Sequence, residues 1–265
     1  MREGTKAMVF HEYGKDQEKN LCLIHASCVR WDVFRPVVKS LARFFHVYVP
    51  ALPGYDPDHP QDDFPGTEET AVMLEDALLE RGVDCLEGLY GLSMGGSIAL
   101  CMLRNNRIHV HQAIVDGGIL PYTYPKWVRR CIAHKDAWMI EIGKKLDPRW
   151  LARFFTGADY GKDDIQYLHD VLQSMSHRTI WNTFYTCNNY MLPRSLPDSY
   201  DRLIYWYGSR EKKARRKDLA YLANMEIPVP TLELIGLDHG ELLTLHPEKF
   251  VTFLSMTILR NDMMP

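Results

Sequence analysis

One short segment of the chain has the residue types and the spacing of a nucleophilic serine. An apolar run begins at Leu89 and continues as Gly91-Leu92-Ser93-Met94-Gly95, with small helix-forming residues after it. This G-x-S-x-G spacing predicts a tight turn from a strand into a helix, which exposes the hydroxyl of Ser93. Glycines are needed at both ends of the pattern because a side chain there would collide with the flanking strand or helix. The same turn aims the first free N–H groups of the helix at a developing oxyanion.

A serine hydroxyl attacks a carbonyl only when a base can take its proton, and the base needs a carboxylate that holds it in place. His239 follows the last predicted strand and is the expected base. Glu211 follows the strand before it and is the expected acid. Two other carboxylates stay open for that role: Asp116, at the end of an earlier strand, and Asp238, directly before the histidine. The sequence therefore predicts Ser93 as nucleophile and His239 as base, with Glu211 preferred over Asp116 and Asp238 as the acid.

The elements that must position these residues alternate between buried strands and helices. Continuous apolar runs indicate strands covered on both faces, and apolar residues recurring at threes and fours indicate helices. The expected strands are 7–13, 21–25, 47–52, 86–92, 110–115, 203–207 and 231–235, and the expected helices are 31–45, 67–82 with Thr67 as N-cap, the segment after Ser93, 212–224 and 247–259. This alternation predicts an α/β fold with a mostly parallel central sheet flanked by helices. Ligands bind beyond the carboxyl ends of such strands, so the ends at His25, Ser93 and Asp116 are expected to form a site.

Between residues 120 and 200 the strand-like runs stop and helical, aromatic-rich sequence takes over. We expect a helical cap, or lid, inserted here into a core domain formed by residues 1–119 and 201–265. Most aromatic side chains of the cap are expected to pack in its own core, and some to face an apolar pocket. They are Tyr122, Tyr124, Trp127, Trp138, Trp150, Phe154, Phe155, Trp181, Phe184, Tyr185 and Tyr190. The basic run from Arg210 to Lys217 is expected to be a solvated helix face.

Composition and charge restrict the class of protein. The 265 residues are 46% hydrophobic and 25% charged, which is ordinary for a globular chain. A net charge of −3 gives no reason to expect nucleic acid or an anionic membrane as a partner. Six scattered cysteines without a C-x-x-C pair argue against a zinc site or a disulfide framework. Residues 1–8 contain no apolar run, and no apolar run of about 18 residues occurs further along, so we expect neither a leader nor a membrane span. We therefore expect a cytoplasmic protein that acts on a small molecule without a metal or cofactor; a homodimer stays open.

Several motifs together resemble the α/β-hydrolase superfamily, specifically its single-domain members that carry a cap. The matching segments are Leu23-Ile24-His25-Ala26-Ser27, Leu52-Pro53-Gly54-Tyr55, Gly91-Leu92-Ser93-Met94-Gly95-Gly96, Tyr207-Gly208-Ser209-Arg210-Glu211, and Asp238-His239-Gly240 followed by the helix from Pro247. They cover about residues 20–118 and 203–259 and leave out the cap. The order Ser, Glu, His along the chain is that of the triad in this superfamily. The resemblance implies the fold and the catalytic class, and it leaves the substrate open.

The resemblance also implies where the oxyanion is held. The expected donors are the backbone N–H groups of Met94 and of a residue in the loop after His25. Relatives commonly carry His-Gly in this loop, whereas this chain has His25-Ala26, and we choose Ser27 over Ala26 as the second donor. His25 itself is expected to be a structural loop histidine, and Cys28 a packing residue.

The expected activity is two-step hydrolysis of an ester-like bond in a small apolar substrate, through an acyl-enzyme on Ser93. A serine at this position argues against haloalkane dehalogenation and epoxide hydrolysis, for which the nucleophile of related enzymes is Asp. Hydrolysis of a C–C bond, cleavage of an amide or thioester, and acyl transfer to an acceptor other than water could use the same residues. The alternative from a different class is a non-catalytic sensor of small apolar ligands on the same scaffold.

Overall fold

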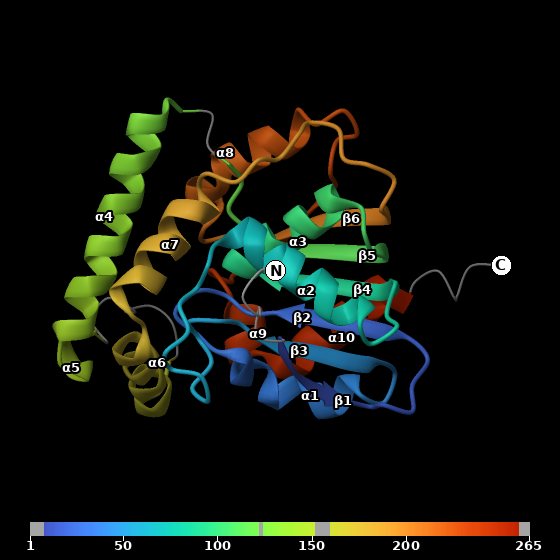
Figure 1. Cartoon of the computed structure of the whole chain (residues 1–265), viewed down its shortest axis with the longest axis horizontal. Helices are drawn as coiled ribbons and strands as arrows, with labels where there is room; N and C mark the ends of the chain where they lie inside the picture. Colours follow the sequence, from blue (N-terminus) through green and yellow to red (C-terminus); the bar gives the residue numbers. More distant parts are fainter. Residues whose placement is uncertain (1–7, 122–123, 152–159, 260–265) are drawn as a thin grey trace, which may run out of the picture.

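The computed structural model describes residues 8–121, 124–151 and 160–259 of the chain. Figure 1 shows a central sheet with helices on both faces and the helices α4 to α7 gathered at one end. The strands are β1 (Val9–Tyr13), β2 (Asn20–Ile24), β3 (His46–Ala51), β4 (Cys85–Leu92), β5 (His109–Asp116), β6 (Tyr200–Gly208) and β7 (Thr231–Leu234). The helices are η1 (Trp31–Phe34, 3-10), α1 (Arg35–Leu41), α2 (Thr67–Leu79), α3 (Met94–Asn105), α4 (Lys126–Lys145), α5 (Pro148–Leu151), α6 (Lys162–Ser174), α7 (His177–Cys187), α8 (Lys212–Ala223), α9 (Glu241–Leu245) and α10 (Pro247–Leu259).

The seven strands form one sheet in the order β1-β3-β2-β4-β5-β6-β7. Only β1 runs antiparallel to its neighbour, and the other pairs are parallel. The expectation of an α/β fold with a mostly parallel sheet is therefore confirmed. The register pairs Leu92 of β4 with Asp116 of β5, and Asp116 with Trp206 of β6. This register brings the carboxyl ends of three strands side by side, directly where Ser93 begins its turn.

The core lies in two layers, one on each face of the sheet. Helices α2, α3 and α8 cover one face through Leu74, Ile98 and Leu222. Helices α1 and α10 cover the other face and contact each other, with Val38 and Leu254 among their buried residues. Burial on both faces explains why the strands appear in the sequence as nearly continuous apolar runs.

Some helix ends differ from the sequence expectations. The expected helix 31–45 is a 3-10 turn followed by α1, which ends at Leu41. Thr67 is the first residue of α2 and not its N-cap; Gly66 occupies that position with φ 139°. The backbone N–H of Thr67 donates instead to the hydroxyl of Thr186 on α7. Tertiary contact has therefore replaced local capping at this helix start. The short helix α9 was not expected.

Helices α4 to α7 lie between β5 and β6 in the chain, in the interval that the sequence assigns to the cap. α7 packs against α2 and α3, whereas the main contacts of α4 are with α6 and α7. The expectation that most aromatic side chains form the core of the cap is only partly right. Trp181 stacks on Tyr185 and Tyr190 is buried, but Trp127, Trp138 and Trp150 are mostly exposed. Tyr122, Phe154 and Phe155 lie outside the described residues.

Among the described helices, none is both long enough and apolar enough to cross a lipid bilayer.

Candidate active site

Ser93 lies on the turn between β4 and α3, in a backbone conformation that residues other than glycine rarely adopt. Its φ is 51° and its ψ is −112°, a conformation that costs on the order of 1–3 kcal/mol and is found mainly at functional sites. Its N–H donates to the carbonyl oxygen of Asp116 at 2.8 Å, which holds the turn against the end of β5. A Cβ on Gly91 would lie 2.3 Å from the carbonyl oxygen of Gly95, and one on Gly95 would lie 2.3 Å from that of Ile24. Close approach of the backbone therefore requires both glycines of the motif.

His239 lies in the loop between β7 and α9, and its ring lies against Gly117. A Cβ on Gly117 would be 2.5 Å from both Nδ1 and Cε1 of the imidazole. Because Gly117 directly follows Asp116, the imidazole lies beside the strand end that holds the turn of Ser93. The ring is about one third exposed, with a side-chain accessibility of 34%. Within the described residues the hydroxyl of Ser93 makes no hydrogen bond, so its contact with His239 stays a prediction. Catalytic hydrogen bonds are often long before substrate binds.

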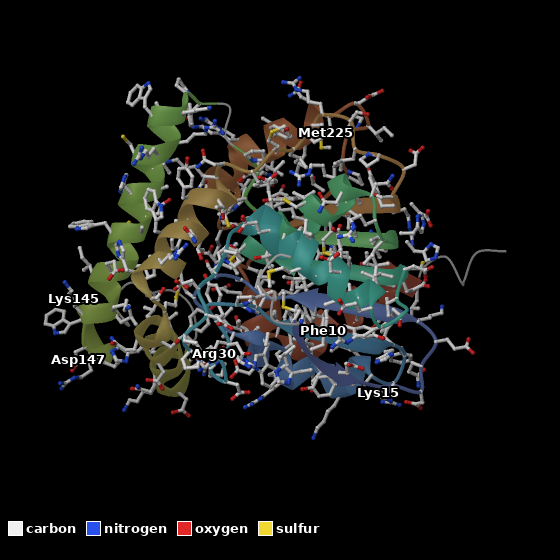
Figure 2. All side chains as sticks on the ribbon, in the orientation of Figure 1. Phe10, Lys15, Arg30, Lys145, Asp147 and Met225 are labelled. Carbon is white, nitrogen blue, oxygen red and sulfur yellow. The ribbon has the colours of Figure 1, made fainter. Side chains whose placement is uncertain are left out.

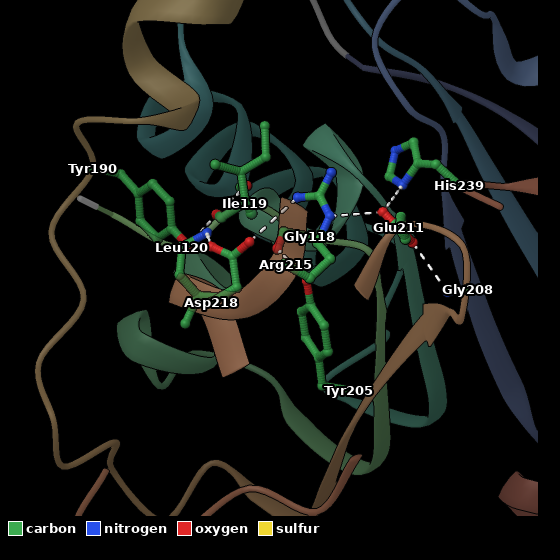
Figure 3. Close-up of polar contacts among 11 residues, drawn as sticks. Gly118, Ile119, Leu120, Tyr190, Tyr205, Gly208, Glu211, Arg215, Asp218 and His239 are labelled. Atoms are coloured by element: carbon green, nitrogen blue, oxygen red, sulfur yellow. Dashed lines mark hydrogen bonds and ion pairs between the residues drawn. The ribbon is translucent and has the colours of Figure 1, made fainter. Parts of the chain in front are cut away.

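Glu211 is the carboxylate that meets the imidazole (Figure 3). Nδ1 of His239 donates to Oε2 of Glu211 at 2.9 Å. The same oxygen accepts from Nε of Arg215 at 2.7 Å, and Oε1 accepts from the backbone N–H of Gly208 at 3.1 Å. Burial alone would raise the pKa of Glu211, but the hydrogen bonds and charges of His239 and Arg215 lower it to about 2. The group is therefore ionised throughout the neutral pH range.

Arg215 connects Glu211 to the start of the helical insertion. Its Nη1 lies 3.4 Å from Oδ2 of Asp218, and Oδ1 of Asp218 accepts from the N–H of Leu120. Burial raises the pKa of Asp218 to about 6, although Arg215 and the Leu120 N–H oppose this rise. The expectation of a solvated face is wrong for Arg215, which is largely buried. The sequence did carry a signal of this role, because residues three or four apart on a helix are neighbours, and Arg215 follows Glu211 by four residues and precedes Asp218 by three.

The two rival carboxylates have other partners. Asp116 is buried and accepts from the hydroxyl of Tyr90 at 2.7 Å. Burial raises the pKa of Asp116 to about 6, against the lowering effects of Tyr90 and His239. Asp238 accepts from the backbone N–H of His239 through Oδ1 at 2.8 Å. In the part of the chain that the structure describes, neither carboxylate forms a hydrogen bond with the imidazole.

The predicted oxyanion donors belong to two segments that the structure brings together. Met94 is the first residue of α3, so its N–H has no partner within the helix. The first turn of α3 lies against the loop after β2, since a Cβ on Gly95 would be 2.8 Å from the carbonyl oxygen of His25. Ser27 lies in this loop, directly before Cys28, which has a φ of 61°. The pairing of the Met94 and Ser27 amides stays a prediction.

His25 has the structural character that the resemblance implied. It is fully buried, and its Nδ1 lies 2.8 Å from the carbonyl oxygen of Ala26. Burial lowers the pKa of His25 to about 4, which outweighs the raising effect of that hydrogen bond. Its ring also packs edge-on against Tyr55. A neutral, buried imidazole in this position shapes the loop that carries Ser27.

A cavity of about 280 Å³ lies between α6 on one side and η1, the start of α1 and α9 on the other. Its apolar lining consists of Val29, Val33, Pro36, Ile165, Leu168 and Leu243. Tyr167 lies at the same cavity, donates to Asp32 and accepts from the N–H of Arg30. Neither Ser93 nor His239 lines the cavity.

The side chains with metal-ligating geometry lie elsewhere. Among the described residues, His109, His111 and Asp201 form the one group whose donor atoms all lie within 4.8 Å of one another. They lie at the amino ends of β5 and β6, whereas Ser93 and Glu211 follow the carboxyl ends of β4 and β6. Oδ1 of Asp201 is 3.0 Å from His109 and Oδ2 is 2.6 Å from His111, so the three side chains already satisfy one another.

Comparison with known proteins places this geometry in a family. The sequence model described as "Alpha/beta hydrolase family" matches residues 23–253. A putative alpha/beta hydrolase family protein from Desulfitobacterium hafniense is 21% identical, with 92% of this chain and 98% of that chain covered and a TM-score of 0.68. MenH from S. aureus is 14% identical, with coverages of 97% and 99% and a TM-score of 0.73. A carboxylesterase from Bacillus subtilis is 14% identical, with coverages of 96% and 89% and a TM-score of 0.68. No protein with a curated description matches the chain.

Proposed function

The chain belongs to the alpha/beta hydrolase family, and from this premise we propose that it is a serine hydrolase that cleaves an ester-like acyl bond. Ser93 is the proposed nucleophile, His239 the base and Glu211 the acid. The observation that carries the proposal is the hydrogen bond from Nδ1 of His239 to Glu211, beside a serine on a strained turn. This bond fixes the imidazole with Nε2 as the nitrogen that is free to accept a proton.

The proposed reaction has two steps. His239 takes the proton of Ser93 while the hydroxyl oxygen attacks the carbonyl carbon, and the N–H groups of Met94 and Ser27 stabilise the oxyanion. The protonated imidazole then gives its proton to the leaving alcohol as the acyl–oxygen bond breaks. In the second step the same imidazole takes a proton from water, which attacks the acyl-enzyme, and it returns this proton to the oxygen of Ser93 as the acyl–serine bond breaks and the acid is released. Glu211 stays ionised and stabilises the imidazolium in both steps.

The proposed substrate is a small apolar ester or related acyl compound. The apolar lining of the cavity between α6, η1, α1 and α9 supports an apolar group, if the substrate extends that far from Ser93. One solved structure with a similar fold is an epoxide hydrolase, 17% identical with a TM-score of 0.68. A serine at position 93 favours acyl chemistry over epoxide opening. Attack of the serine on an epoxide would form an ether that histidine-activated water cannot hydrolyse, whereas attack on a carbonyl forms an ester that it can hydrolyse.

A fluorophosphonate probe tests the proposal, because it reacts only with an activated serine. We expect rapid labelling of the full chain, complete loss in Ser93→Ala and full labelling of Ser40→Ala, which changes an exposed serine on α1. A series of p-nitrophenyl esters of increasing chain length, beside amide and thioester analogues, then identifies the bond and the depth of the pocket. A folded, unreactive wild-type chain would contradict the enzyme and favour the non-catalytic sensor. Product analysis with added alcohols or amines distinguishes hydrolysis from acyl transfer.

A further inference from the structure

The outer side of α4 exposes more large apolar surface than any other described helix. The exposed fractions of Trp127 and Trp138 are 71% and 64%, and Met139 and Ile142 are exposed beside them. Trp127, Cys131, Trp138 and Ile142 follow one another at intervals of four, seven and four residues. This spacing places them on one stripe along the helix. Single exposed apolar residues are common, but an ordered stripe with two tryptophans marks an interaction surface.

Packing fixes which side of α4 faces outward. Ala133, Ala137 and Gly143 are its buried residues, and they lie toward α6 and α7, which are its main neighbours. A Cβ on Gly143 would lie 3.6 Å from the side chain of Leu172 on α6. Figures 1 and 2 show α4 at the outer edge of the molecule, with side chains on its free side directed away from the body. The stripe is therefore a defined surface, presented by a helix that is anchored on its opposite side.

The charge of α4 differs in sign from that of the whole chain. The helix contains six Lys and Arg residues and two acidic residues, whereas the chain as a whole has a net charge of −3. Both acidic residues are paired: Asp136 with Lys135, and Glu141 with His177. Lys126, Arg130 and Lys145 are exposed and have no ion-pair partner within the described residues. An apolar stripe is thus flanked by uncompensated positive charge.

We propose that this α4 outer face (Trp127, Arg130, Cys131, Lys135, Trp138, Met139, Ile142 and Lys145) docks on the anionic surface of a lipid bilayer. The indole rings would lie at the level of the headgroups, where an apolar body and a polar N–H are both satisfied. The lysine and arginine side chains extend past the apolar stripe to reach headgroup phosphates. The helix lies in the plane of the surface and does not span the bilayer.

Two other occupants are disfavoured by the same observations. A symmetric dimer would place this basic face against an identical basic face, because a two-fold axis pairs each surface patch with itself. Like charges across such an interface repel. An acidic protein partner would satisfy the charge, but no residue of α4 lines any of five cavities found among the described residues, so these offer no pocket for side chains from such a partner. A flat stripe of indoles and basic residues is typical of a lipid surface.

The proposal revises the expectation drawn from net charge. A net charge of −3 gives no reason to expect an anionic membrane as a partner, but it averages a basic helix with a more acidic remainder. Attraction to a charged surface falls off within roughly 10 Å at moderate ionic strength. The local charge of the α4 outer face therefore decides binding, and the total does not.

Vesicle co-sedimentation tests the proposal with the full chain. We expect binding to vesicles of phosphatidylcholine with phosphatidylglycerol, little binding to phosphatidylcholine alone, and loss of binding at high salt. The variant Arg130→Gln/Lys145→Gln should bind roughly 10- to 30-fold more weakly, because each basic residue near the surface strengthens binding about fivefold. Trp127→Ser/Trp138→Ser should weaken binding at any salt concentration. A blue shift of tryptophan emission on adding anionic vesicles should disappear in this variant.

The matched control is α8, which is also basic but has no exposed apolar stripe. Its variant Lys213→Gln/Arg216→Gln removes two exposed charges of the same kind. We expect it to bind vesicles as the wild type does. Equal weakening in this variant would overturn the proposal, because attraction would then be unspecific. Failure of the wild type to bind anionic vesicles would also overturn it. So would a dimer that Trp138→Ser converts to a monomer, since α4 would then be a self-interface.

Each variant needs a readout of correct folding that is independent of vesicles. Far-UV circular dichroism and the thermal midpoint serve here, because the changed side chains are exposed and leave the buried side of α4 intact. Neither measurement depends on the proposed catalytic activity. The docking proposal and the hydrolase proposal can therefore fail separately.

Discussion

Replacing Glu211 with Gln gives the sharpest test of the acid. The substitution preserves shape but removes the charge and turns one acceptor oxygen into an NH₂ group. All three partners of the carboxylate are donors: His239, Arg215 and the N–H of Gly208. The NH₂ group must therefore face a donor in either orientation. If it faces His239, the imidazole must accept at Nδ1 and carries its proton on the nitrogen that should take the proton of Ser93.

The size of the effect follows from this geometry. Loss of the anion and of the correct tautomer should lower kcat by roughly 10³- to 10⁴-fold. Stability should fall as well, because Arg215 is largely buried and keeps only Asp218, at 3.4 Å. Removing one partner of a buried pair costs about 3–5 kcal/mol when nothing remains. The remaining carboxylate reduces this to about 1–3 kcal/mol, which lowers the thermal midpoint by roughly 3–10 °C for a chain of this size.

The assay is ester turnover under saturating substrate, with thermal unfolding measured on the same samples. The matched control is Asp116→Asn, which changes a second buried carboxylate beside the site. An Asn carbonyl at this position can still accept from the Tyr90 hydroxyl, so turnover should stay within about threefold of the wild type. If Glu211→Gln is nearly as active as the wild type while Asp116→Asn is inactive, the acid is Asp116 and the reasoning about Glu211 is refuted.

Three further predictions concern other parts of the site. Gly117→Ala should fold, as judged by circular dichroism, but lose at least about 100-fold in turnover, because its Cβ would lie 2.5 Å from the ring of His239. Between pH 4 and pH 8 the free energy of unfolding of Asp116→Asn should rise by on the order of 2 kcal/mol relative to that of the wild type. Burial raises the pKa of Asp116 from 3.8 to about 6, so the wild type loses stability as the pH rises through this range. The measurement is the denaturant midpoint of both proteins at each pH, and an equal pH dependence of the two midpoints would contradict the prediction. Arg215→Met should lower the free energy of unfolding by about 3–5 kcal/mol, and added Asp218→Asn should restore part of it, as urea unfolding of both variants will show.

The order of strands and helices is readable from this sequence because each strand is buried on both faces. Continuous apolar runs such as 21–25 and 47–52 can be identified as buried parallel strands because helical segments alternate with them. Helix ends were less predictable, because they depend on contacts from distant segments. Thr67 has the residue type of an N-cap, yet Thr186 on α7 takes its N–H as a partner. No sequence pattern around residue 67 predicts this contact with a distant helix.

The residues of the candidate site also differ in whether the sequence reveals them. Residues that a motif fixes locally, such as Ser93 between its glycines, are visible in the sequence. Gly117 is not, because its importance lies in the ring of His239 resting on it. The exposure of Trp127 and Trp138 was also beyond the sequence, since aromatic residues at helical spacing indicate packing without saying on which side. Only the neighbours of α4 decide that.

The basic run after Glu211 shows why residue type alone is insufficient. Arg215 and Lys217 belong to the same run, but only Arg215 lies on the side of α8 that faces Glu211 and Asp218. Its guanidinium reaches one carboxylate through Nε and the other through Nη1, which a lysine ammonium, as a single point charge, cannot do in a fixed geometry. Because Asp218 also accepts from Leu120, where the helical insertion begins, the proposed acid is positioned from β6, from α8 and from the base of the insertion together. Glu211 is therefore held by donors on every oxygen, and the extra methylene that distinguishes it from Asp adds little freedom at the imidazole.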